Sequence, residues 1–240
     1  LATGGNAMVK AAYSCGKPAL GVGAGNVPAY VEKSANIRQA AHDIVMSKSF
    51  DNGMVCASEQ AVIIDKEVYD EFVEEFKSYN TYFVNKKEKA LLEEFCFGAK
   101  ANSKICAGAK LNPDIVGKPA TWIAEQAGFS VPEDTNILAA ECKEVGEKEP
   151  LTREKLSPVI AVLKSESRED GVEKARQMVE FHGLGHSAAI HTADEELTKE
   201  FGKAVRAIRV ICNSPSTFGG IGVVYNAFLP SLTLGCGSYG

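Results

Sequence analysis

The feature that most constrains the fold is an alternation of two hydrophobic periodicities along most of the chain. Short runs rich in β-branched and other apolar residues alternate with longer segments in which apolar residues recur every three or four positions. We expect strands over 60–64, 137–141, 158–163, 187–191 and 207–212, and helices over 35–49, 86–97, 121–127, 168–182 and 194–205. This order is typical of an α/β layered fold with a largely parallel sheet.

Local signals add detail near the N-terminal end. A helix is expected directly after Gly4-Gly5, and residues 19–26 are expected to form a short strand that enters a glycine loop. A further helix is marked by Val68, Phe72 and Phe76, with Asp65 as its expected N-cap.

The composition excludes several classes of function. The formal net charge is -5, and no basic stripe is present that would favour a nucleic-acid partner. No apolar run approaches the roughly 20 residues of a membrane span, and no signal peptide opens the chain. The 7 cysteines form no CxxC pair and have no zinc-site spacing, which favours a reducing cytoplasm over a disulfide framework.

One cysteine and one histidine stand out as candidate catalytic residues. Cys56 follows a turn and precedes a strand, so it can be presented at the rim of a sheet, although residue type alone favours a buried thiol. His186 lies on a loop that leads into a strand, where a histidine bonded to backbone is the simpler reading. A metal pair with His182 is not expected, because Gly183 and Gly185 break the helix between the two.

Glycine turns and one carboxylate complete the set of candidates. Gly4-Gly5 precedes a helix, whose N-terminus can bind a phosphate, whereas Gly21 to Gly25 fits a structural turn better than a dinucleotide fingerprint. Glu154 precedes a strand and a proline, and most carboxylates in such places are solvated. Taken one at a time, these residues do not indicate a function.

Read together and in order, these segments resemble the aldehyde dehydrogenase superfamily over residues 1–240. More narrowly, they are similar to its CoA-acylating branch, as found in the aldehyde dehydrogenase half of bifunctional aldehyde-alcohol dehydrogenases. The motifs that carry the resemblance are Leu1-Ala2-Thr3-Gly4-Gly5, Gly16-Lys17-Pro18-Ala19, Ser49-Phe50-Asp51-Asn52-Gly53 leading to Cys56-Ala57-Ser58-Glu59-Gln60, Glu154-Lys155-Leu156-Ser157-Pro158, Gly185-His186-Ser187 and Ser231-Leu232-Thr233-Leu234-Gly235-Cys236.

The resemblance implies a role for each candidate residue. Cys56 matches the family's catalytic thiol, which forms a thioester with the acyl group. Gly4 and Gly5 match the turn that meets the pyrophosphate of NAD, and Glu154 matches the acidic residue that hydrogen-bonds the nicotinamide ribose. His186 matches a histidine of the CoA-dependent branch that assists proton transfer to or from a thiol.

One departure from the family pattern bears on the acyl acceptor. Hydrolytic members carry a general-base Glu in a Glu-Leu-Gly-Gly segment, and the matching stretch here is Gly21-Val22-Gly23-Ala24. Without that carboxylate, the acyl group is expected to survive until coenzyme A attacks it. The expected reaction interconverts acetyl-CoA and NADH with acetaldehyde, CoA and NAD, with no metal.

The resemblance also implies an organisation for the chain. Residues 1–30 are expected to be the tail of a Rossmann-type cofactor domain, 31–218 the catalytic domain, and 219–240 a return segment towards the cofactor and oligomer side. Two alternatives stay open: a semialdehyde dehydrogenase of the acyl-phosphate type, and a catalytically incompetent piece that retains the assembly surfaces of a homo-oligomer or filament. Apolar residues near the C-terminal end could supply such a surface (Tyr225, Phe228, Leu229, Leu232, Leu234).

Overall fold

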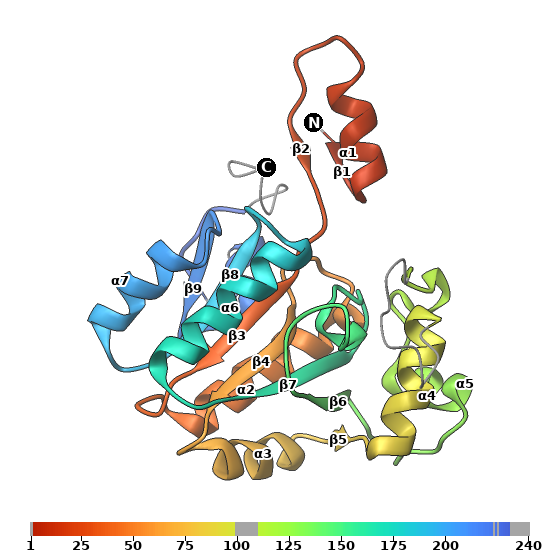
Figure 1. The fold of residues 1–240 in the computed structure, drawn as a ribbon, viewed down its shortest axis with the longest axis vertical. Coiled ribbons are helices and arrows are strands. Elements are labelled where there is room, and N and C mark those ends of the chain that lie inside the picture. The colour runs from red at the N-terminus through yellow and green to blue at the C-terminus, as the bar shows by residue number, and fades with distance from the viewer. Residues whose placement is uncertain (1, 99–109, 223, 225, 231–240) are drawn as a thin grey trace.

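The computed structural model describes residues 2–98, 110–222, 224 and 226–230. Its main body is a 7-stranded sheet in the order β5-β6-β7-β4-β3-β8-β9, in which every pair of neighbouring strands is parallel (Figure 1). The strands are β3 (Val27–Val31), β4 (Glu59–Asp65), β5 (Thr81–Phe83), β6 (Ile137–Cys142), β7 (Val159–Ser165), β8 (Ser187–His191) and β9 (Arg209–Cys212). The prediction of an α/β fold with a parallel sheet is confirmed.

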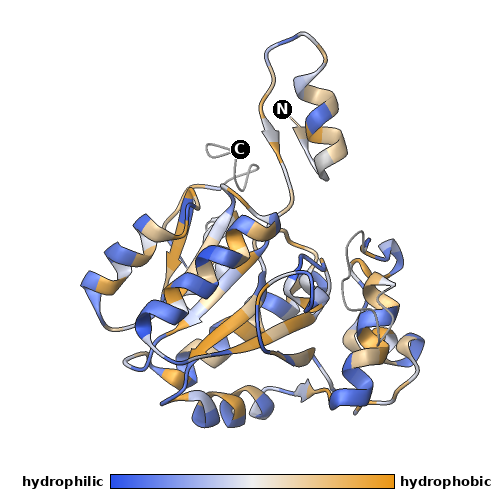
Figure 2. Cartoon of the chain, viewed as in Figure 1, coloured by the Kyte–Doolittle hydropathy of each residue, from blue (hydrophilic) through white to orange (hydrophobic). Residues whose placement is uncertain are grey.

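Helices cover both faces of this sheet and divide the apolar core into two clusters. Along β4, Ala61 and Ile63 belong to one cluster while Val62 and Ile64 belong to the other, because successive strand residues point to opposite faces. Figure 2 shows the resulting apolar strands between helices whose outer sides are hydrophilic. The first cluster packs under α4 (Lys86–Phe97), α5 (Ala120–Ala127), α6 (Arg168–His182) and α7 (Glu195–Ala204), and the second under α2 (Ile37–Ser49) and α3 (Tyr69–Ser78). The short helix α8 (Ser216–Ile221) packs on α2, β8 and β9.

The N-terminal residues form a small unit of their own. Strands β1 (Ala2–Thr3) and β2 (Gly21–Val22) pair in parallel, and helix α1 (Asn6–Tyr13) lies between them in the sequence. In Figure 1 this unit projects beyond the main sheet and is joined to it by the segment that leads into β3. The predicted division of the chain at residues 30 and 218 stays a prediction, although the main sheet begins at Val27.

Strand β3 was not expected from the sequence. All five of its residues are buried, so it shows no apolar–polar alternation, and Pro28 stands at its second position, where proline is typical of strand edges and bulges. The structure accommodates Pro28 through a register shift between Val27 and Pro28 in the pairing with β4. β3 nevertheless lies inside the sheet, between β4 and β8.

The expected N-cap role of Asp65 is wrong. Helix α3 begins at Tyr69, and its N-cap residue Val68 offers no side-chain hydrogen bond. The Asp65 carboxylate instead accepts hydrogen bonds from the hydroxyls of Tyr30 (2.8 Å) and Ser165 (2.6 Å). It therefore ties the ends of β3, β4 and β7 together, a tertiary role that local spacing does not reveal.

Several expectations fall on the C-terminal end. Tyr225, Leu232 and Leu234 of the expected association surface lie outside the described residues, whereas Phe228 and Leu229 are 59% and 86% exposed. Within the described ranges, none of the helices combines the length and apolar character that a bilayer crossing requires. The same part of the chain contains no cluster of three or more potential metal ligands.

A matched pair of glycine substitutions tests the packing of α6 on the sheet. A Cβ added at Gly171 would lie 2.4 Å from the ring of Tyr30, whereas one added at Gly202 in α7 would meet nothing within 4 Å. We expect Gly171→Ala to lower the free energy of unfolding by about 1–3 kcal/mol through overpacking. Gly202→Ala should raise it by about 0.5–1 kcal/mol, because alanine is the better helix former. Urea unfolding followed by circular dichroism measures both, and equal effects would contradict the described contact.

Candidate active site

The candidate residues lie at the amino-terminal ends of neighbouring strands. Cys56 comes before β4, Glu154 before β7 and His186 before β8, while Gly25 comes before β3. Because these four strands are parallel and adjacent, the loops that precede them meet at one edge of the sheet. This edge is opposite to the carboxyl-terminal edge at which open α/β sheets usually bind ligands.

Gly25 is the point at which the three loops converge. A Cβ on this residue would lie 2.4 Å from the carbonyl oxygen of Cys56 and 3.0 Å from Cε1 and Nδ1 of His186. Its backbone N–H donates a hydrogen bond to Oε1 of Glu154 at 2.8 Å. The structure therefore brings Cys56, His186 and Glu154 together, and only glycine leaves room for that approach.

A tight turn delivers Cys56 to this point. Helix α2 ends at Ser49, and the 3-10 segment Phe50–Gly53 follows, as the turn signal in the sequence predicts. Asp51 and Asn52 both have a φ of 50°, in the left-handed region that asparagine and aspartate tolerate best among residues with a side chain. The amide of Asn52 donates a hydrogen bond to the carbonyl oxygen of Gly117 (3.0 Å), which fixes the turn.

The Cys56 thiol is half-buried and protonated at neutral pH. Burial, and then the negative charge of Glu154, raise its pKa to about 11. The backbone N–H groups of Cys56 and Ala57 and the charge of Arg209 act in the opposite direction. Because the thiolate is the nucleophile, the sulfur needs a proton acceptor or a change in its surroundings before it reacts.

His186 is neutral at the same pH. It is 2% exposed, and burial, followed by the charge of Arg209, lowers its pKa to about 4. Its Nδ1 lies 3.1 Å from the hydroxyl of Ser187, whereas Nε2 has no hydrogen-bond partner among the described residues. The imidazole is therefore neutral and buried, and a ligand can reach its unengaged ring nitrogen only if the surroundings rearrange.

Glu154 is not the solvated carboxylate that its residue type suggests. It is only partly exposed, and burial raises its pKa to about 7 against the effects of the Gly25 N–H and of Lys48 and Lys155. The carboxyl group therefore changes its charge near neutral pH, directly beside the thiol whose pKa it influences.

A buried polar network beneath the site was missed at the sequence level. Gln60 accepts hydrogen bonds from the backbone N–H of Lys155 (3.0 Å) and from Nζ of Lys48 (3.3 Å), and it donates to the carbonyl oxygen of Ser58 (3.1 Å). Gln60 thus connects the Cys56 loop to the Glu154 loop. A single polar residue in a β-rich run gives no sequence signal for such a role.

Lys155 makes the second connection between these loops. Its side chain is fully buried, and its ammonium nitrogen donates to the carbonyl oxygens of Gln60 (3.0 Å), Leu151 (2.6 Å) and Arg153 (2.7 Å). Burial nonetheless lowers its pKa to about 7. Three carbonyl acceptors keep the amine hydrogen-bonded at that depth, so it fixes the backbone on both sides of Glu154.

Gly4 and Gly5 are not among the residues that converge on Gly25. Gly5 is the N-cap of α1, and its carbonyl oxygen accepts hydrogen bonds from the N–H groups of Met8 (2.9 Å) and Val9 (3.3 Å). A Cβ on Gly5 would meet nothing within 4 Å. The backbone at this helix start is therefore open to a phosphate, but the role of both glycines stays a prediction.

Replacing Glu154 tests its electrostatic coupling to the thiol. In Glu154→Gln the pKa of Cys56 should fall by about one unit, because a negative charge beside the thiolate is removed. The alkylation of Cys56 by iodoacetamide, followed by peptide mass spectrometry across the pH range, should shift accordingly to lower pH. Glu166→Gln, an exposed carboxylate after β7, is the control and should leave the profile in place. An unchanged profile in Glu154→Gln would contradict the described proximity.

Replacing Gln60 tests the network beneath the site. Gln60→Leu leaves the N–H of Lys155 and the amine of Lys48 without this acceptor, and we expect it to cost roughly 2–4 kcal/mol of unfolding free energy. Gln177→Leu on the exposed side of α6 is the matched control and should change stability by less than about 0.5 kcal/mol. Urea denaturation gives both values, and similar losses would show that Gln60 does not hold the two loops.

Comparison with known proteins identifies relatives of this chain. The chain is 94% identical over 240 residues to an aldehyde-alcohol dehydrogenase of Streptococcus pneumoniae (serotype 4), covering 100% of this chain and 27% of that protein. It therefore spans about a quarter of the length of that relative. The structure also matches an acetylating aldehyde dehydrogenase of Geobacillus thermoglucosidasius, with a TM-score of 0.89 and 44% identity, over 99% of this chain and 50% of that one.

A second solved structure adds a ligand-bound example. A propionaldehyde dehydrogenase of Rhodopseudomonas palustris, solved with bound CoA and an acylated cysteine, matches with a TM-score of 0.83 and 28% identity, over 98% of this chain and 51% of that one. The model of the aldehyde dehydrogenase family matches residues 1–223. On the basis of these matches, the chain belongs to the aldehyde dehydrogenase family.

Proposed function

We propose that this chain carries the acyl-transfer chemistry of a CoA-acylating aldehyde dehydrogenase, which interconverts acetyl-CoA and NADH with acetaldehyde, CoA and NAD. The observation that supports this most is the convergence of Cys56, His186 and Glu154 on Gly25. The acetylating and CoA-bound relatives have the same family fold.

The first step is the addition of Cys56 to the aldehyde. The thiol releases its proton to solvent, its sulfur forms a bond to the carbonyl carbon, and the carbonyl oxygen becomes an oxyanion. The backbone N–H groups of Cys56 and Ala57 already act on the sulfur, so they are placed to donate to that oxyanion. Loss of hydride from the carbon then leaves a thioester on Cys56.

A nicotinamide cofactor supplies the acceptor for that hydride when it is bound. The residues present fit such a group at two places. The open backbone at Gly5, at the start of α1, suits a pyrophosphate. The Glu154 carboxylate is partly exposed beside the thiol and suits a ribose hydroxyl.

Transfer of the acyl group to CoA is the second half of the reaction. We expect His186 to accept the proton of the CoA thiol after a local rearrangement exposes its Nε2, which is buried without a hydrogen-bond partner among the described residues. The CoA sulfur then bonds to the thioester carbon. The bond from carbon to the Cys56 sulfur breaks, and the proton taken from the CoA thiol passes from His186 to that sulfur. The absence of a carboxylate in the segment Gly21 to Ala24 removes the group that would help water compete.

The proposal also covers the binding partners, the assembly and the location of the protein. Acyl-CoA and aldehyde are its small-molecule partners, and assembly into a homo-oligomer or filament, like a location in the cytoplasm, stays a prediction. The acyl-phosphate type of semialdehyde dehydrogenase is the rival, since it also uses a cysteine.

Mass spectrometry of the protein that contains this chain tests the proposal. After acetyl-CoA is added, we expect an acetyl group on Cys56 that is absent in Cys56→Ala and kept in Cys15→Ala, which changes an exposed cysteine of the small unit. A γ-glutamyl phosphate analogue added in parallel should not acylate Cys56. Acylation by the phosphate analogue alone would favour the rival, and acetylation that survives Cys56→Ala would overturn the assignment of the nucleophile.

A further inference from the structure

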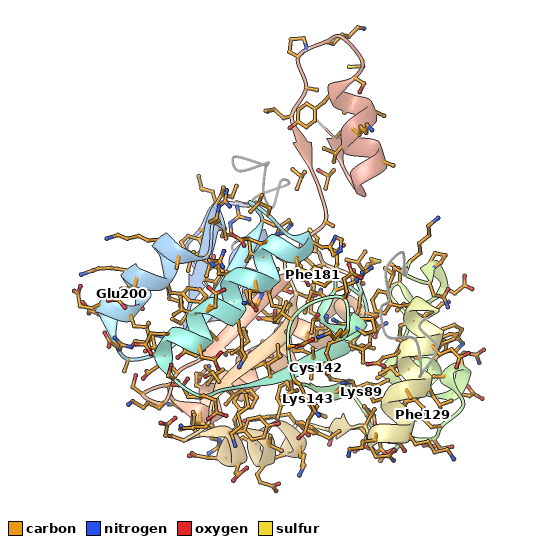
Figure 3. All side chains as sticks on the ribbon, in the orientation of Figure 1. Lys89, Phe129, Cys142, Lys143, Phe181 and Glu200 are labelled. Atoms are coloured by element: carbon orange, nitrogen blue, oxygen red, sulfur yellow. The ribbon has the colours of Figure 1, made fainter. Side chains whose placement is uncertain are left out.

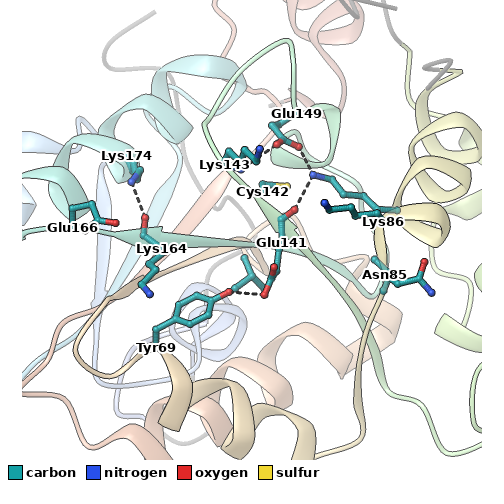
Figure 4. Close-up of a pocket in the computed structure, with 13 residues that line it drawn as sticks. Tyr69, Asn85, Lys86, Glu141, Cys142, Lys143, Glu149, Lys164, Glu166 and Lys174 are labelled. Carbon is teal, nitrogen blue, oxygen red and sulfur yellow. Dashed lines mark hydrogen bonds and ion pairs between the residues drawn. The ribbon is translucent and has the colours of Figure 1, made fainter. Parts of the chain in front are cut away.

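A cavity lies at the edge of the sheet opposite to the Cys56 thiol. It has a volume of about 800 Å³, and it opens where β5, β6 and β7 end (Figure 4). Cys56, Glu154 and His186 are not among its lining residues. In Figure 3, Lys89, Cys142 and Lys143 group around this place, away from Phe181 near the end of α6, which leads into the His186 loop.

The position of this cavity is the one at which parallel sheets usually bind ligands. Its walls come from the carboxyl ends of three neighbouring strands and from three helices: Tyr69 begins α3, Lys86 begins α4, and Lys174 lies in α6. In open α/β sheets the loops after the strands diverge and leave a crevice at this edge. The acyl-transfer chemistry does not use it.

The lining is rich in lysine. Five lysines from four separate segments line the cavity, and they are Lys86, Lys89, Lys143, Lys164 and Lys174. Two of them are engaged: Lys89 contacts the Glu149 carboxylate, and Lys174 donates to Asp170. These two ammonium groups are largely neutralised within the protein.

The carboxylates of the cavity are engaged as well. Glu141 accepts a hydrogen bond from the Tyr69 hydroxyl (3.0 Å), and Glu149 accepts from Lys89 and from the backbone N–H of Lys143 (3.0 Å). Glu166 pairs with a lysine outside the cavity (3.4 Å). Figure 4 shows the contacts of Glu141 and Glu149 on one side of the cavity.

Three ammonium groups remain without a carboxylate partner. Within the described ranges, the side chains of Lys86, Lys143 and Lys164 form no ion pair and no hydrogen bond, and Lys164 lies over the ring of Tyr69 at 5.0 Å from its centre. They come from the start of α4, the end of β6 and the end of β7, so the fold gathers like charges around one hollow. An anion placed near them is attracted by all three and repelled by Glu141, whose hydrogen bond from Tyr69 leaves its negative charge in place.

We propose that this cavity binds a small molecule carrying two or more phosphate groups. Lysine is a common phosphate ligand because its ammonium is a compact point charge with three donors. A volume of about 800 Å³ is in the range of small-molecule sites. The site is separate from the thiol edge, so its occupant does not donate the acyl group in the proposed reaction.

Calorimetric titration with inorganic pyrophosphate tests this site on the whole protein. We expect saturable binding that weakens at least about tenfold in Lys86→Ala/Lys164→Ala, because two of the three unpaired charges are lost. Lys199→Ala/Lys203→Ala on α7 removes the same charge outside the cavity and should bind like the parent. Thermal unfolding of each variant checks that the fold is retained.

Two outcomes would overturn the proposal. The first is the absence of saturable binding in the parent protein. The second is equal weakening in both double variants, which would mean that pyrophosphate responds to net charge alone. Neither readout depends on acylation of Cys56, so this site and the proposed reaction can fail independently.

Discussion

The close approach of three loops to the backbone of Gly25 is the constraint on which the site depends. Four parallel strands start at this edge, and the loops before them carry the thiol, the carboxylate and the imidazole. The Cys56 carbonyl and the His186 ring occupy the space that a side chain at position 25 would need, and Glu154 accepts from its N–H. The reacting groups are therefore positioned by backbone packing at the edge of a rigid sheet.

Burial sets the charge state of the site before any ligand arrives. It raises the pKa of Cys56 and of Glu154 and lowers that of His186, so the thiol and the imidazole are both neutral at pH 7. The charges that act on the thiol and the imidazole are those of Glu154 and Arg209. Ligands that approach the Glu154 carboxylate alter the field at the sulfur, which links their binding to the reactivity of the thiol.

The sheet gives its two edges different chemistry. At the amino edge the Cys56 and Glu154 loops are tied together by Gln60 and Lys155, which limits the movement of the side chains they carry. At the carboxyl edge the segments diverge around a cavity lined by lysines, some of which remain unpaired. Parallel strands explain this division, because all of their starts face one side of the body and all of their ends face the other.

The sequence by itself determined the alternating elements, the parallel α/β class and the identity of the candidate residues, because periodicity and motif order are local properties of the chain. It did not indicate β3, whose buried residues and Pro28 lack a strand signature, and it assigned Asp65 to a helix cap although the carboxylate joins three strands. Only the tertiary structure decided that Cys56, Glu154 and His186 meet at Gly25. Their proximity arises from strand order, and strand order depends on packing between segments far apart in the chain.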